Sequence, residues 1–312
     1  MKIIERIENI TEPIHNAVVT IGNFDGVHKG HRALFDQAIK KASEIKGNSV
    51  VITFQPHPLR VLKIKNPPPQ ITRYEQKTSL IAKAGIDVLI VIPFNAAFAE
   101  ISPESFVEEL LVKKIGMKAI VVGQDYAFGK NRKGDIDLLK TLGLTHGYEV
   151  LVADWINMSP DNAKRISSTR IRNFVKEGRV NEVKPLLGRY YQLKGQVSKG
   201  RDRGGKLLGF PTANINIYDE LCPQTGVYAV TVQYDDVAYQ GVANIGFSPT
   251  FDDHKFTIEI HLLDFNQNIY EKNIKVNFIE RLRSEKKFNN IEELSNQIRK
   301  DIDIAKRILS SL

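Results

Sequence analysis

The chain is poor in cysteine and has no long apolar stretch. Cys222 is the one cysteine among 312 residues, which excludes an internal disulfide and a cysteine-based zinc site. No apolar stretch approaches the roughly 20 residues that a membrane-spanning helix needs. The N-terminal MKIIERIENI carries acidic residues and has no apolar core followed by a cleavage site, unlike a secretory signal. These absences predict a protein of the reducing cytoplasm.

The charge balance is basic. The chain has 44 lysines and arginines against 36 aspartates and glutamates, a formal net charge of +8. The basic residues are spread along the chain without a long lysine or arginine tract. We therefore interpret the charge as a complement to polyanionic ligands such as ATP. A nucleic-acid-binding regulator built on an old enzyme scaffold stays open as an alternative.

The two halves of the chain have different hydrophobic periods. Up to residue 183, short apolar strands alternate with amphipathic helices, which predicts an α/β domain with a mostly parallel sheet. From residue 184, strands with period-two alternation predict a small closed antiparallel barrel, followed by a terminal helix from about Ile291. The expected strands of the sheet are Ala17–Ile21, Val50–Phe54, Val88–Ile92, Ala119–Val122 and Glu149–Ala153.

The most informative stretch is Thr20–His31, a glycine-rich turn between a predicted strand and a predicted helix. Gly22 and Gly26 break the strand, and an apolar helical period follows the turn. Turns of this kind bring phosphates close to backbone N–H groups and a helix N-terminus. His28 and His31 can donate protons or hydrogen bonds to a polyphosphate, so the stretch indicates nucleotide chemistry. Two polar histidines on an ordinary turn are the simpler alternative.

A second stretch, RISSTRIR, places three hydroxyl residues between arginines just before an apolar helical period. This order predicts a helix N-terminus, where free N–H groups, hydroxyls and guanidinium groups together can bind a β- or γ-phosphate. A serine cap with solvated arginines is the alternative. The residues expected to bind nucleotide here are Arg165, Ser167, Ser168, Thr169 and Arg172.

Two further loops follow predicted strands of the first half. Pro56–Pro58 is a stiff turn that carries one imidazole and comes just after Phe54, and Asp125 and Tyr126 follow the fourth strand between glycines. Because ligands of parallel sheets bind beyond the carboxyl ends of the strands, we expect these loops to converge with the two histidines on one edge. Taken alone, the first loop is more typical of a turn, and the aromatics of the second could belong to the core.

The second half contains a glycine-rich basic loop from Gly200 to Asn214. Such a loop can close over phosphates and exclude water. Thr212 and Asn214, one residue apart in an extended segment, present two neutral oxygen ligands on one face. Together with ATP oxygens they could hold Mg²⁺. Glu259 lies on the polar side of its predicted strand, where a solvent-exposed glutamate is the alternative.

The motifs and their order along the chain resemble those of a known family. His28-Lys29-Gly30-His31 resembles the HxGH signature of the nucleotidyltransferase superfamily, and the run from Ile166 to Arg172 resembles the ISSTxxR motif that accompanies it. The first half is similar to the FMN adenylyltransferase module of prokaryotic bifunctional FAD synthetases, and the second half is similar to riboflavin kinase. The resemblance implies a Rossmann-like nucleotidyltransferase domain over residues 1–183. It implies a six-stranded antiparallel Greek-key barrel with a terminal helix over residues 184–312.

The resemblance also implies the chemistry. Riboflavin would be phosphorylated by ATP to FMN, and FMN would then be adenylylated by a second ATP to give FAD and pyrophosphate. The expected ligands are ATP, riboflavin, FMN and FAD, with Mg²⁺ accompanying ATP and the flavins acting as substrates and products, not as redox cofactors. No nucleic acid and no membrane are expected as partners. One departure is visible, because Glu271 stands where a glycine is expected after Tyr270. A chain with one live activity stays an alternative.

The family further implies roles for individual residues. Two histidines and a glutamate would be catalytic, His28 and His31 by stabilising phosphate charge and Glu259 as the base for the riboflavin 5′-hydroxyl. The ATP of adenylyl transfer would be held by Gly22, Phe24, Asp25, His28, His31, Asp125, Arg165, Ser167, Ser168, Thr169 and Arg172. The flavin side would be formed by Phe54, His57, Pro58 and Tyr126. The ATP of the kinase would be held by Gly200, Lys206, Gly209, Pro211, Thr212 and Asn214, with Thr212 and Asn214 at the magnesium.

Overall fold

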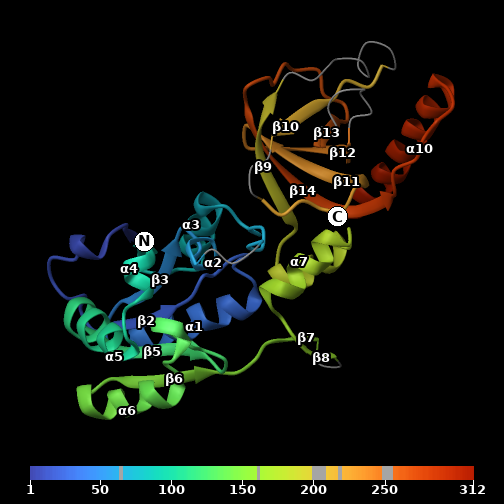
Figure 1. Ribbon diagram of the computed structural model, residues 1–312. Helices are drawn as coiled ribbons and strands as arrows, with labels where there is room; N and C mark the ends of the chain where they lie inside the picture. The colour runs from blue at the N-terminus through green and yellow to red at the C-terminus, as the bar shows by residue number, and fades with distance from the viewer. Residues whose placement is uncertain (63–65, 160–161, 199–208, 217–219, 248–255) are drawn as a thin grey trace. The chain divides into compact units, whose positions relative to one another are not determined.

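The computed structural model describes residues 1–62, 66–159, 162–198, 209–216, 220–247 and 256–312. These form two compact units, Met1–Ser168 and Thr169–Leu312, each described here by itself (Figure 1). The border between the units lies 15 residues before the domain boundary predicted from the hydrophobic periods, so the helix that follows Ser168 packs with the second unit. No helix among the described residues is long and apolar enough to cross a membrane.

The first unit is built on a six-stranded sheet in which every pair of neighbours is parallel. The strand order is β1-β4-β3-β2-β5-β6. The strands are β1 (Lys2–Ile4), β2 (Ala17–Ile21), β3 (Ser49–Gln55), β4 (Val88–Pro93), β5 (Met117–Gly123) and β6 (Glu149–Ala153). The central strands are rich in β-branched residues and are almost completely buried, as expected for a parallel sheet covered on both faces.

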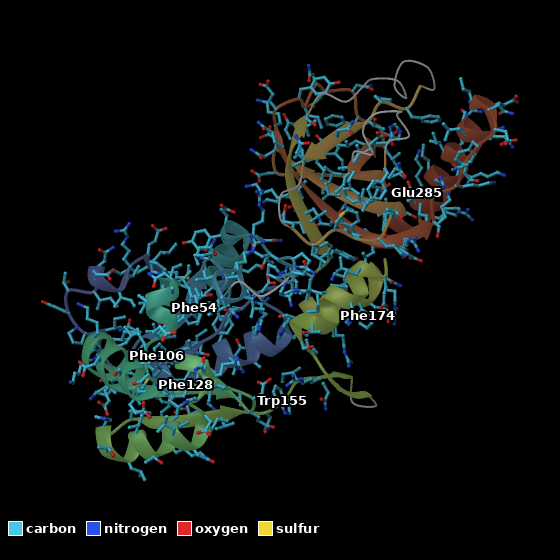
Figure 2. The ribbon with its side chains drawn as sticks, in the orientation of Figure 1. Phe54, Phe106, Phe128, Trp155, Phe174 and Glu285 are labelled. Atoms are coloured by element: carbon cyan, nitrogen blue, oxygen red, sulfur yellow. The ribbon has the colours of Figure 1, made fainter. Side chains whose placement is uncertain are left out.

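Helices cover both faces of this sheet. On one face, Phe35 of α1 (Lys29–Glu44) and Ile81 of α3 (Tyr74–Lys83) pack against Val51 and Leu89. On the other face, the π-helical η2 (Phe106–Ile115) contributes Leu111 to the larger apolar cluster. Phe54, Phe106 and Phe128, labelled in Figure 2, join Phe98 in a chain of aromatic contacts with ring centroids 5.8 to 6.1 Å apart. The helical segments are η1 (Ile7–Asn9), α1 (Lys29–Glu44), α2 (Pro58–Val61), α3 (Tyr74–Lys83), α4 (Ala96–Ala99), α5 (Pro103–Ser105), η2 (Phe106–Ile115), η3 (Lys130–Arg132) and α6 (Ile136–His146).

The order of the strands creates a crevice at the carboxyl end of β2. After β2 the chain continues into β3 on one side, and it later returns to place β5 on the other side. In open parallel sheets, ligands bind at such a reversal of strand order, beyond the carboxyl ends of the strands. The histidine-bearing turn follows β2 directly, so the topology places it at this point. A short antiparallel pair, β7 (Asn157–Ser159) and β8 (Asn162–Arg165), follows β6.

The second unit contains a closed barrel of six antiparallel strands. The order around the barrel is β10-β13-β12-β11-β14-β9, in which β11, β12 and β13 form a meander and β10 returns beside β13. This is a Greek key, so the predicted barrel is confirmed. The strands are β9 (Tyr191–Ser198), β10 (Ala213–Asn216), β11 (Gly226–Tyr234), β12 (Val237–Phe247), β13 (Phe256–Leu262) and β14 (Asn273–Arg283). Before the barrel come α7 (Ser168–Lys176), η4 (Val180–Glu182) and α8 (Lys184–Leu187).

The predicted terminal helix is α10 (Ile291–Leu309), and it packs on the barrel. Ala305 and Leu309 join an apolar cluster with residues of β11, β12 and β14. An ion pair between a half-buried arginine and a buried aspartate accompanies this cluster. Arg283 donates to both carboxylate oxygens of Asp301 through Nε at 3.0 Å and through Nη2 at 2.8 Å, and Gln297 donates to the same carboxylate. The carboxylate of Asp301 therefore ties the helix to the end of β14.

Candidate functional site

A pocket lies at the carboxyl ends of β2, β5 and β6 in the first unit. Most of the residues predicted to bind nucleotide line this pocket. The lining residues are Ile21, Gly22, Phe24, His28, Gly30, His31, Leu34, Gly123, Asp125, Tyr126, Ala153, Asp154, Trp155, Ile156, Arg165, Ile166, Ser167 and Ser168. Two of the three loops predicted to converge, those that follow β2 and β5, line this pocket together with the RISS run, whereas the loop that follows β3 contributes His57 to a second pocket.

His28 and His31 form one stacked pair at the start of α1. His28 is the residue that caps this helix, and its Nδ1 accepts from the backbone N–H of His31 at 3.2 Å. The two rings are nearly parallel with centroids 3.6 Å apart. Because Nδ1 of His28 accepts a hydrogen bond, a neutral His28 carries its proton on Nε2 and can donate it. The glycine between the histidines allows the His28 ring to approach the helix closely, since a Cβ on Gly30 would lie 3.1 Å from Cε1 of His28, which is a tight contact.

The phenyl ring of Phe24 packs against His31 of this pair. It is almost fully buried, and its ring meets His31 edge to face at 5.2 Å and Phe35 at 4.9 Å. Ser167 and Ser168 are far from the histidines in the sequence but line the same pocket. The hydroxyl of Ser168 donates to the carbonyl of Asp25 at 2.9 Å, which holds the RISS segment against the histidine-bearing turn. Thr169 and Arg172 lie on α7 in the second unit.

The carboxylate of Asp25 is directed away from this pocket. It accepts from the backbone N–H groups of Ile71 and Thr72 at 3.0 Å and from the Thr72 hydroxyl at 3.2 Å. The same hydroxyl accepts from Gly26 N–H at 3.0 Å. These bonds hold the turn after β2 against residues 71–72, and Asp25 lines a second, smaller pocket. The arrangement gives Asp25 a structural task in shaping the turn.

This smaller pocket is lined by two residues predicted for the flavin side. Phe54 and His57 line it, and His57 caps α2, which begins at Pro58, by accepting from Leu59 N–H at 3.2 Å. Tyr126, the fourth predicted flavin residue, lines the larger pocket and stacks on Phe128 with centroids 5.5 Å apart. The predicted flavin residues are therefore divided between two neighbouring pockets of the first unit.

Sequence reasoning missed Lys77, which lines the smaller pocket. Its side chain is only 7% exposed, and Nζ donates to the Asn23 carbonyl at 3.2 Å and to the Thr53 hydroxyl at 3.1 Å. Burial lowers the pKa of the Lys77 ammonium from 10.5 to about 8, while the nearby Asp25 carboxylate opposes this change. A lysine in an amphipathic helix is normally solvated, so the sequence offered no signal for its burial.

In the second unit, the register of the barrel places Glu259 beside two asparagines. Asn214 of β10 lies directly opposite Glu259 of β13 on one side, and Asn244 of β12 lies opposite it on the other. Glu259 alternates with the buried Ile258 and Ile260, so it belongs to the outer face of the barrel. It is half-buried there, and desolvation raises the pKa of its carboxyl. The barrel therefore brings together a predicted base and a predicted magnesium ligand.

The segment before β10 is held by His261. Nδ1 of this histidine donates to the Pro211 carbonyl at 2.8 Å, and its ring meets Phe210 edge to face at 5.6 Å. Thr212 follows at once and is half-buried, whereas Gly209 and Pro211 are exposed. Gly209 has φ +75° with open space at its Cβ position. Two residues predicted to bind the kinase ATP, Gly200 and Lys206, lie outside the described residues.

Comparison with known proteins gives a family for each half of the chain. The model of the FAD synthetase family matches residues 10–170, and that of the riboflavin kinase family matches residues 187–309. Curated relatives named bifunctional riboflavin kinase/FMN adenylyltransferase match almost the whole chain. The relative from Bacillus subtilis is 38% identical over 322 residues, covering 97% of this chain and 98% of the relative. The one from Escherichia coli K12 is 35% identical and covers 96% of each chain.

The chain belongs to this bifunctional family. The predicted family, its two domain types and its classification as an enzyme are thereby confirmed. A further relative, from Haemophilus influenzae, is 36% identical and covers 100% of both chains. The two family models leave residues 171–186 between them, a stretch that includes most of α7 and of α8.

A solved structure has the same fold over nearly the full length of this family member. It matches with a TM-score of 0.87 at 31% identity and covers 97% of this chain and 98% of its own. Its title names a macrolide-efflux protein from Streptococcus pneumoniae. That title differs from the names of the curated relatives, which all refer to flavin nucleotide synthesis. The likeness agrees with the presence of the two domain types that the family models indicate.

Proposed function

We propose that this chain makes FAD from riboflavin in two ATP-dependent steps, each at its own site. The barrel transfers the γ-phosphate of ATP to riboflavin and forms FMN, and the α/β unit then joins FMN to the adenylyl group of a second ATP. The observation that carries the proposal is the stacked His28–His31 pair in a pocket at the carboxyl ends of β2, β5 and β6. Glu259 opposite Asn214 on the barrel supports the first step in the same way.

In the adenylyl transfer, an oxygen of the FMN phosphate attacks the α-phosphorus of ATP, and the bond to the pyrophosphate oxygen breaks. The attacking oxygen is already anionic, so the step needs no general base. The task of the site is to stabilise the charge that develops on the phosphates. His28, donating from Nε2, and its stacked partner His31 supply this stabilisation, and the hydroxyls of Ser167 and Ser168 lie in the same pocket.

In the kinase step, Glu259 accepts the proton of the riboflavin 5′-hydroxyl as its oxygen attacks the γ-phosphorus, and ADP leaves. The desolvation that raises the pKa of Glu259 brings this carboxylate closer to the working pH and makes it a better base. Glu259 lies on the middle one of three paired strands, and this pairing keeps the backbone that carries the carboxylate rigid. Positioning and electrostatics dominate phosphoryl transfer, so a fixed base suits this chemistry.

The residues present fit a magnesium ion that is shared with substrate. Thr212 and Asn214 offer neutral oxygens, and the described residues contain no group of three or more histidines, cysteines or carboxylates that could hold a metal alone. Mg²⁺ characteristically binds through few protein ligands together with substrate phosphates and water. Thr212 and Asn214 would therefore hold it with ATP, where it supplies neutralisation of phosphate charge. ATP, riboflavin, FMN and FAD are the proposed ligands, and the cytoplasm is the proposed compartment.

The proposal is tested by incubating the purified protein with riboflavin, ATP and Mg²⁺ and separating the flavins by chromatography. We expect the wild type to form FMN and then FAD. His28→Ala should accumulate FMN, because loss of one charge-stabilising donor typically slows a reaction on the order of a hundredfold or more. Glu259→Gln should fail on riboflavin yet adenylylate supplied FMN, with a loss on the order of a hundred- to ten-thousandfold in the kinase step.

Circular dichroism of both variants controls for folding. If either folded variant loses both steps, the assignment of one chemistry to each site is wrong. A wild type that stops at FMN would favour a single live activity. A wild type that makes no flavin nucleotide but binds RNA or DNA with a steep salt dependence would favour the nucleic-acid alternative.

A further inference from the structure

The larger pocket of the first unit has two chemically different ends. One end holds the stacked histidines and Ser167 and Ser168, which suit phosphate groups. The other end is formed by the segment that follows β6, where Trp155 and Ile156 line the pocket. The segment that follows β6 lies beside the RISS run, because the backbone N–H of Ile166 donates to the Ile156 carbonyl at 2.9 Å. The aromatic residue and the predicted phosphate-binding residues therefore line one continuous pocket.

Trp155 lies at the edge of the pocket and is unusually exposed for a tryptophan. Its side chain is 38% exposed, although tryptophan is highly buried on average. Figure 2 shows it on the segment that joins β6 to β7. Neither the strand and helix periods nor the phosphate motifs pointed to it, because it is a lone aromatic residue in an irregular segment. An aromatic face at the edge of a pocket binds flat, unsaturated rings well.

The indole is in contact with Arg165, whose guanidinium is in turn anchored by Asp125. The guanidinium of Arg165 lies over the Trp155 ring, 4.3 Å from its centroid. Nη1 of Arg165 also donates to Oδ2 of Asp125 at 2.9 Å. The three side chains come from three separate segments, which follow β5, follow β6 and end β8. All three line the pocket, so the cation–π contact and the ion pair together build one wall of it.

We propose that Trp155 is the residue on which the nucleobase of ATP stacks during adenylyl transfer. Arg165 and Asp125 act as positioning residues that hold the indole at the required angle. The inference rests on the proposed function, because it assumes that the ATP phosphates occupy the histidine end of the pocket. Stacking on an aromatic side chain recognises any base through its π-face. The wall therefore supplies affinity for a purine ring.

The first test uses the fluorescence of the full-length protein. Trp155 is the one tryptophan of the chain, so emission excited at the red edge of the indole band reports on this residue and on nothing in the barrel. The protein is titrated with ATP and, separately, with inorganic tripolyphosphate, which has the phosphate groups but no base. We expect ATP to quench the emission and tripolyphosphate to leave it nearly unchanged. No change with ATP, or an equal change with both ligands, would overturn the proposal.

The second test measures the KM for ATP in the conversion of supplied FMN to FAD. Loss of an aromatic platform typically weakens the binding of one base on the order of five- to 150-fold. We expect Trp155→Ala to raise this KM on the order of tenfold or more, with a much smaller effect on kcat, and Trp155→Phe to restore most of the affinity. The KM for ATP in riboflavin phosphorylation serves as the internal control and should not change.

Leu144→Ala is the matched control variant, since Leu144 is an exposed apolar residue of α6 that does not line the pocket. An unchanged KM in a folded Trp155→Ala enzyme that still makes FAD would refute stacking on Trp155 while leaving the proposed function intact. A wild type that makes no FAD would instead refute the proposed function. In that case the fluorescence titration still decides whether a nucleotide base reaches Trp155.

Discussion

Replacement of Lys77 by methionine should change how the stability of the first unit depends on pH. The Lys77 ammonium is 7% exposed and donates to two neutral oxygens, so the folded state holds a charge that water would solvate better. Burial lowers its pKa from 10.5 to about 8. At 1.36 kcal/mol per pKa unit, this difference corresponds to about 3 kcal/mol of destabilisation when the group is charged in both states.

The direction of this pH dependence follows from the difference in bound protons between the folded and the unfolded protein. Below pH 8 the ammonium is charged in the folded and the unfolded protein, and the full cost of burial is present. Between pH 8 and 10.5 the folded protein releases this proton while the unfolded chain retains it, so the cost disappears as the pH rises. Relative to Lys77→Met, the wild type should therefore gain about 2 to 3 kcal/mol of unfolding free energy between pH 7 and pH 10.

The assay is equilibrium unfolding in urea, followed by the fluorescence of Trp155, which lies in the same unit. Groups that titrate in both proteins, such as the tyrosines, cancel in the difference between wild type and variant. Lys83→Met is the control, because Lys83 is an exposed residue of the same helix. It should show a difference that is small and independent of pH. A difference for Lys77→Met that stays constant from pH 7 to pH 10 would refute the argument from burial.

Two further predictions concern the second unit. Asp301→Asn should lower the unfolding free energy by about 3 to 5 kcal/mol, since it leaves a half-buried guanidinium without its carboxylate. Asp303→Asn, on the exposed side of the same helix, should have little effect, and equal thermal midpoints for the two variants would contradict this reasoning. A fragment that begins at Thr169 should unfold at a higher temperature than one that begins at Lys184, because the fully buried Val175 accepts a backbone hydrogen bond from residue 224. Equal midpoints for the two fragments would show that α7 adds nothing to the barrel.

The hydrophobic periods predicted the elements well where the elements are long. All five predicted strands of the sheet are present, because continuous β-branched runs have few other stable environments. The edge strand β1 was missed, since it has three residues and only Ile4 is buried. The hydrophobic periods also do not show with which unit a helix near the domain boundary packs. A helix such as α7 has the same amphipathic pattern whichever domain it packs against, so its pattern does not say to which unit it belongs.

The residues of the candidate sites also differ in whether the local sequence or the tertiary structure brings them together. His28 and His31 are three residues apart at a helix start, where local geometry alone brings them onto one face. Asn214 and Glu259 lie on separate strands, and their meeting depends on the register of β10 against β13. A slip of one residue would turn Glu259 into the barrel. No local pattern specifies that register, although the alternation of buried residues along both strands is consistent with it.

The sequence by itself determined the two kinds of domain, the family and the phosphate-binding turn, because hydrophobic period, glycine placement and histidine spacing are properties of neighbouring residues. Only the tertiary structure decided that Asp25 bonds to residues 71–72, that Lys77 is buried beside it, and that Arg165 rests on Trp155. Each of these contacts joins residues from different segments. Their energies depend on burial and on distances that arise only when the segments pack together.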